Sequence, residues 1–147
     1  MDNGNDKNNT FFRFEDLRIY HKALNYTKWV HETTRQYTSD QDQGLTDRFD
    51  TSSQNIVLNI AEGSARNKSQ FIYYLKMAKT AVRECLVFTS VFHNLELLTD
   101  AEEDLSRSQL MEMTKMIGAL ISSLQRSNNK REDDNDSYEP KNEMPAD

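Results

Sequence analysis

The sequence is poor in cysteine, proline and glycine: its 147 residues include one cysteine, two prolines and four glycines. The single thiol, Cys85, excludes an intramolecular disulfide and a cysteine zinc cluster. So little glycine and proline is unusual for a β-rich or loop-rich protein. These scarcities predict one mostly helical domain.

Long apolar runs are also missing. The first residues, Met1 to Thr10, are polar and lack the apolar core of a signal peptide. No run of 18 apolar residues occurs, so the sequence offers no membrane-spanning candidate. We therefore expect a soluble, cytoplasmic protein without membrane partners.

The sequence also has no excess of basic over acidic residues, and its net charge is −6. Residues 128–147 hold three basic and seven acidic side chains, both prolines and few apolar groups. Such a segment cannot repay the entropy of ordering. We expect a disordered arm over 1–13, a folded body over 14–127 and a disordered acidic tail over 128–147. The body is nearly neutral, with thirteen basic and fifteen acidic residues, which disfavours a general nucleic-acid binder.

Four amphipathic stretches have helical spacing, at roughly 14–37, 46–62, 67–95 and 99–126. Gly63 is expected to end the second as a left-handed stop, and Glu15 and Asp16 to occupy the first turn of the first. Capping-box spacing begins the third at Asn67 and the fourth at Thr99. The third carries the longest seam with three- and four-residue steps: Phe71, Tyr74, Ala78, Ala81, Cys85, Phe88, Phe92 and Leu95. Short connections between such helices predict an all-α, antiparallel up-down-up-down four-helix bundle.

Several short strings resemble one known family. They are Phe14-Glu15-Asp16-Leu17, Gly44-Leu45, Asn59-Ile60-Ala61-Glu62-Gly63, and Phe71 with Leu75 and Ala78. Together they resemble the four-helix-bundle proteins first noticed within intervening sequences of 23S ribosomal RNA genes. The resemblance implies a left-handed bundle that assembles as a ring-like pentamer. It also implies kinship with basic accessory proteins of retroelement reverse transcriptases, which engage nucleic acid.

The chain departs from that family's pattern in the second helix. Members commonly carry adjacent arginines after Gly-Leu, whereas here Arg48 stands alone between Asp47 and Asp50. The departure weakens any nucleic-acid role carried over from the resemblance.

Two polar sets are candidate sites. The basic patch on and before the third helix is the best nucleic-acid or partner-binding candidate, although charge on an exposed helix face is ordinarily just solvated. It comprises Arg66, Lys68, Lys76, Lys79 and Arg83. The second set runs along the second helix and is either a binding strip or a set of hydrogen bonds between helices or subunits. It comprises Arg48, Ser52, Asn55, Asn59 and Glu62. Of these, we expect Asn59 and Glu62 to act structurally, by holding backbone groups of the next loop or helix.

The apolar face of the third helix is broader than one partner helix needs. A lone bundle is expected to expose an apolar patch around Ile72, Leu75 and Leu86, and soluble monomers rarely tolerate a large patch of this kind. The sequence thus predicts a closed homo-oligomer with these residues at its interface, and the resemblance makes a pentamer the favoured number.

No catalytic, metal-binding or cofactor pattern is evident. The sequence lacks a Glu-x-x-His pair, a P-loop, a dinucleotide fingerprint and a Gly-x-Ser-x-Gly string. Three hypotheses remain open. The first is a non-enzymatic oligomeric scaffold that binds a protein or RNA. The second is an RNA-binding accessory protein, and the third, with least support, is an enzyme with a small-molecule site in the bundle core.

Overall fold

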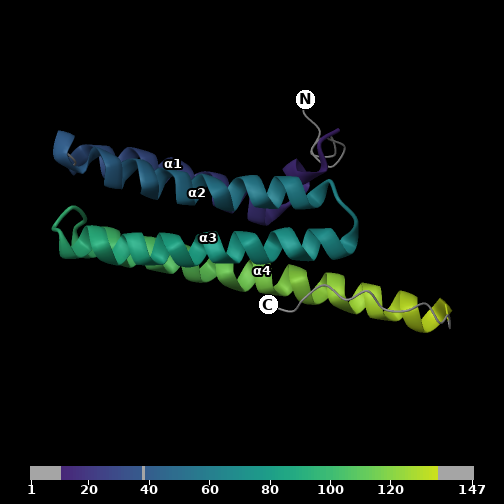
Figure 1. Cartoon of the computed structure of the whole chain (residues 1–147). Coiled ribbons are helices and arrows are strands. Elements are labelled where there is room, and N and C mark those ends of the chain that lie inside the picture. Colours follow the sequence, from purple (N-terminus) through teal and green to yellow (C-terminus); the bar gives the residue numbers. More distant parts are fainter. Residues whose placement is uncertain (1–10, 38, 136–147) are drawn as a thin grey trace, which may run out of the picture.

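The described part of the chain folds into four α-helices, whose arrangement Figure 1 shows. The computed structural model describes residues 11–37 and 39–135, and side chains are described for 11–36 and 39–127. Its helices are α1 (Arg18–Tyr37), α2 (Gln43–Ser64), α3 (Lys68–Asn94) and α4 (Asp100–Asn135), with short 3-10 turns η2 (Arg13–Asp16) and η3 (Asp40–Asp42). The described part contains no strand, which confirms the all-α, four-helix prediction. The disorder expected for 1–10 and 136–147 lies outside the described residues.

Consecutive helices run in opposite directions (Figure 1). Contacts between neighbours show this, because residue numbers fall along one helix as they rise along the other. The pairs are Thr27–Ser53 and Arg35–Asp50 for α1 and α2, Phe49–Phe92 and Ser52–Glu84 for α2 and α3, and Thr89–Ser106 and Lys68–Ser127 for α3 and α4.

Side-chain caps begin the last two helices. Asn67 Oδ1 accepts a hydrogen bond from the Gln70 amide at 2.9 Å. At α4, Thr99 Oγ1 accepts from the Glu102 amide at 3.1 Å, and Glu102 Oε1 accepts from the Thr99 amide at 2.9 Å. Each cap satisfies amides that a helix start leaves unpaired, a contribution of about 1 kcal/mol. Both predicted helix starts are confirmed.

The predicted start of the first helix is wrong. Residues 13–16 form the 3-10 turn η2, and Leu17 is extended, with φ −86° and ψ 127°. Leu17 packs against the core, and the Phe14 ring meets the Tyr20 ring at 4.9 Å. Tertiary contacts thus break the helical pattern here, so the first turn of α1 contains no acid, in contrast to the prediction.

Two predicted helix ends are also wrong. Helix α2 continues through Gly63 to Ser64, and Gly63 does not have a positive φ. Helix α4 passes Arg126 and continues to Asn135. No glycine or proline interrupts this stretch, so local propensity extends the helix into a segment predicted to be disordered.

The core lies between all four helices. Its fully buried members include Tyr26, Phe49, Ile56, Phe92 and Met113. A chain of hydroxyl groups crosses it, because Ser106 Oγ lies 2.8 Å from the Tyr26 hydroxyl and 2.7 Å from Thr89 Oγ1. These bonds satisfy buried polar groups and fix α1, α3 and α4 in one register.

Candidate functional site

A groove of about 600 Å³ runs between α3 and α4. We call it the α3–α4 groove. Apolar side chains form its floor, and charged ones stand at its rim. Lys79, Val82, Arg83 and Leu86 line it from α3, and Asp104, Arg107, Ser108, Leu110, Met111 and Thr114 line it from α4.

The groove gathers only part of the predicted basic patch. Lys79 and Arg83 line it, whereas Lys76 is half-buried and outside the lining. Arg66 precedes α3 and Lys68 is its first residue, and neither lines the groove. The structure therefore divides the predicted patch in two.

The outlying cations have partners within the chain. Arg66 donates to Glu62 Oε2 from Nε at 2.8 Å and from Nη2 at 2.6 Å, and its guanidinium lies over the Tyr74 ring. The hydrogen bond to Glu62 raises the pKa of Arg66, which stays charged. Lys68 donates to Ser127 Oγ on α4. These contacts brace the end of the bundle and reduce what either cation can offer a ligand.

Arg107 and Met111 are site residues that the sequence analysis missed. Both lie on the flank of α4 that faces α3, and Met111 is 56% exposed. The only sequence signal for these two residues is their position beside the core seam of α4. Every amphipathic helix has residues at such positions, so the signal does not indicate a site. Their relation to Lys79 and Arg83 requires the register of α3 against α4, which the Thr89–Ser106 pair fixes.

The predicted oligomer patch does not form as expected. Leu75 is completely buried inside a single chain, so a lone bundle does not expose it. Ile72 and Leu86 are half-buried and pack against the core, and Leu86 also lines the α3–α4 groove. The neighbouring helix α4 covers this side of α3, a closure that helix periodicity alone cannot reveal.

Exposed apolar side chains lie elsewhere on α2 and α3. We call Leu58, Tyr73, Met77 and Val87 the apolar face; they are 61%, 46%, 42% and 57% exposed. Tyr73 and Val87 are two heptads apart and so share one side of α3. Val87 also lines a second groove of about 490 Å³ between α2 and α3, where the Arg48 guanidinium lies 5.7 Å from the centre of the Phe88 ring.

The Asn-Ile-Ala-Glu-Gly string positions the end of α2. Asn59 Nδ2 donates to the Asn55 carbonyl at 2.8 Å, and Glu62 accepts from Arg66. Glu62 thus contacts the loop that follows α2, as predicted, but through the Arg66 side chain and not through a backbone group. Asn59 contacts only its own helix. Gly63 is buried where α2 crosses α3: an added Cβ would lie 2.7 Å from Tyr74 Cβ and 2.9 Å from Phe71 Cδ1. Close helix packing, and not a left-handed stop, explains this glycine.

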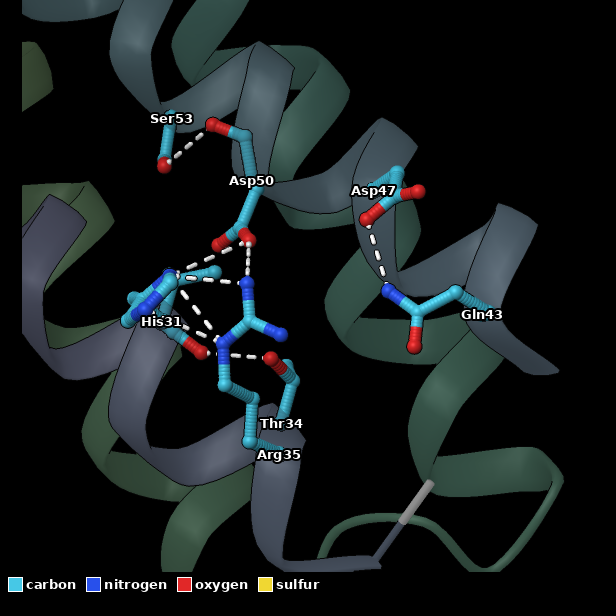
Figure 2. Close-up of polar contacts among 8 residues, drawn as sticks. His31, Thr34, Arg35, Gln43, Asp47, Asp50 and Ser53 are labelled. Atoms are coloured by element: carbon cyan, nitrogen blue, oxygen red, sulfur yellow. Dashed lines mark hydrogen bonds and ion pairs between the residues drawn. The ribbon is translucent and has the colours of Figure 1, made fainter. Parts of the chain in front are cut away.

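A polar cluster joins α1 to α2 (Figure 2). Asp50, only 6% exposed, has Oδ2 at 3.3 Å from both Arg35 Nη2 and His31 Nδ1. The nearby hydroxyls of Thr34 and Ser53 donate to the backbone carbonyls of Val30 and Asp50. A histidine and a carboxylate are thus adjacent, but no activated hydroxyl accompanies them, so the cluster acts as a clamp between helices.

Other reactive groups are shielded or unsuited to catalysis. Burial raises the pKa of the Cys85 thiol and of the Tyr26 hydroxyl well above their ordinary values, so both stay protonated. Among the side chains that the structure describes, no three His, Cys, Asp or Glu residues are placed to hold a metal ion. In the same part of the chain, no helix has both the length and the apolar character needed to span a membrane.

Fold and surface together describe an all-α four-helix protein with two open grooves and a partly apolar exterior. The family model described as 23S rRNA-intervening sequence protein matches residues 15–119. The chain belongs to this family, which suggests a non-enzymatic helical protein. No curated protein matches it.

Proposed function

We propose that this protein is a non-catalytic homo-oligomeric scaffold that binds another macromolecule. The observation that carries the proposal is the apolar face, because Leu58 and Val87 are more than half exposed on helices otherwise well packed. Water contact with such side chains is unfavourable, and a subunit interface removes it. A pentamer is the expected number, from the family resemblance.

Light scattering at micromolar concentration tests the assembly. The wild type should have the mass of a closed oligomer, and Val87→Glu should lower it, because a buried unpaired charge is costly. Gln125→Glu adds the same charge at an exposed position of α4, outside the apolar face, and should leave the mass unchanged. A monomeric wild type would contradict the proposal.

RNA binding is the second candidate function, and it has one supporting observation. Arg107 joins Lys79 and Arg83 at the α3–α4 groove and so enlarges the cationic surface. Binding to a structured RNA should then weaken steeply with salt, as phosphate contacts release counterions. The engagement of Arg66 and Lys68 within the chain argues for weak binding.

A further inference from the structure

The α3–α4 groove combines an apolar floor with a charged rim. Val82 and Leu110 form a buried floor, Leu86 is half-buried, and Met111 is largely exposed. Methionine and leucine adapt their shape to an incoming apolar side chain. The volume of about 600 Å³ holds a few side chains, as specific binding sites do.

The rim of the groove carries uncompensated positive charge. Within the described part of the chain, no ion pair joins Lys79, Arg83 or Arg107 to a carboxylate. Asp104 is the single acid among the lining residues. By contrast, Lys22 pairs with Glu112 and Arg66 pairs with Glu62, each at 2.6 Å. A chain with a net charge of −6 therefore presents three cations against one acid here.

The composition of the floor distinguishes between ligand classes. Single-stranded nucleic acid is bound by cationic grooves whose aromatic side chains stack on bases. This groove has cations, but no aromatic residue is among its lining side chains. An aliphatic floor suits the leucine-rich face of an amphipathic helix, and a cationic rim suits carboxylates that flank such a face.

We propose that the α3–α4 groove binds an acidic amphipathic helix of a partner protein. Its apolar side chains pack on Leu86 and Met111, and its carboxylates pair with Lys79, Arg83 and Arg107. This inference rests on the proposed scaffold function and identifies the chemistry of the bound partner.

Designed peptides provide the probe. The first is a blocked, fluorescein-labelled helical peptide with leucines at i, i+3, i+4 and i+7 and glutamates on both flanks. The second replaces its glutamates by lysines, and the third replaces its leucines by glutamines. Anisotropy titrations of the full chain should show saturable binding of the first peptide and at least tenfold weaker binding of the other two.

Protein variants locate the site. Lys79→Glu with Arg107→Glu should weaken binding of the acidic peptide at least tenfold. The matched control, Lys115→Glu with Arg126→Glu, makes the same charge change at exposed positions outside the groove lining and should bind within twofold of the wild type. Met111→Gln should weaken binding several-fold, whereas Leu24→Gln, at a 43% exposed position of α1 outside both the groove and the apolar face, should not.

Four results would overturn the inference. The first is that folded wild type does not bind the acidic peptide, and the second is that both charge-reversed variants lose affinity for it equally. The third is that a structured RNA does not displace the peptide and yet binds more weakly to Met111→Gln than to the wild type. A fourth is a fall in oligomer mass caused by Met111→Gln, which would assign the groove to subunit contacts. If the peptide does not bind but Val87→Glu still lowers the oligomer mass, the scaffold function stands and only the groove inference is wrong. The two proposals can therefore fail separately.

Discussion

At the scale of single residues, Gly63 allows α2 to pack closely against α3. Tyr74 and Phe71 on α3 occupy the space that a β-carbon would need. Backbone and ring atoms at such distances cannot yield without moving a helix, so the cost of a larger side chain falls on the α2–α3 packing.

Gly63→Ala should therefore destabilise the protein by about 1–3 kcal/mol, a typical cost of overpacking. Gly118→Ala is the matched control, since nothing lies within 4 Å of its added Cβ. That change should stabilise α4 by about 0.5–1 kcal/mol, because alanine loses less backbone entropy than glycine. Urea denaturation measures the change in the free energy of unfolding for both variants, which should have opposite signs. Equal denaturation midpoints for Gly63→Ala and Gly118→Ala would refute the packing account.

Asp50 depends on its neighbours at the same scale. Its carboxylate is buried, and Oδ1 has no hydrogen-bond partner among the described residues, so Arg35 compensates its charge at Oδ2 alone, where His31 also approaches. A buried carboxylate that loses a partner becomes costly.

Arg35→Ala should cost about 1–2 kcal/mol, less than the loss of a fully buried ion pair because the Arg35 side chain is 44% exposed. In an Asp50→Asn background the same change should cost much less, since no charge then needs compensation. A double-mutant cycle by denaturant unfolding measures this coupling. Additive losses would show that Arg35 acts through packing alone.

At the scale of elements, the turn from α3 to α4 brings a histidine to the acidic start of a helix. His93 Nε2 lies 2.7 Å from Asp100 Oδ1, and Nδ1 lies 3.5 Å from Glu103 Oε1. The hydrogen bond to Asp100, together with the charges of Glu103 and Asp104, raises the pKa of His93 above its ordinary value of 6.5.

A raised pKa makes the turn more stable at low pH. The stabilisation is complete below the unfolded-state pKa of about 6.5 and is lost as pH rises through the higher folded-state pKa. His93→Gln should therefore lower the melting midpoint more at pH about 5.5 than at pH about 8.5. Asp100→Asn should reduce the same pH dependence. A His93→Gln penalty that is identical at both pH values would exclude the ion pair as its cause.

At the scale of the whole molecule, α4 is longer than the bundle needs. Lys68, the first residue of α3, contacts Ser127, and α4 then continues past the turn between α2 and α3 (Figure 1). Residues after 127 therefore have no opposing stretch of α3. Their helix is maintained by propensity and not by the shared core.

Truncation after Ser127 should remove helical signal without loss of stability. Circular dichroism at the helix band should fall in amplitude, while the melting midpoint stays within about 5 °C, or roughly 1 kcal/mol for a domain of this size. A larger shift would show that the acidic tail packs on the bundle. The truncated chain should also keep the oligomer mass of the wild type if the apolar face forms the interface.

Local sequence alone determined the helical class, the two capped helix starts and the buried seams. Caps and seams depend on side chains three or four residues apart, so Thr99 with Glu102, or Leu110 with Met113, can be recognised without the fold. Lys79 and Arg83 were predicted as binding candidates for the same reason. Their place in a groove was not predicted.

Tertiary structure alone decided which helix flanks are covered and which remain open. Leu75 is buried because α3 packs into the bundle, whereas Leu58 and Val87 stay exposed, and periodicity gives the same signal for all three. Likewise, a glycine is required at position 63 because α3 packs so close to α2 there. Arg107 lines the same groove as Lys79 and Arg83 because antiparallel packing places those flanks of α3 and α4 side by side. These relations join residues far apart in the chain, so the register between helices fixes them and no local pattern can.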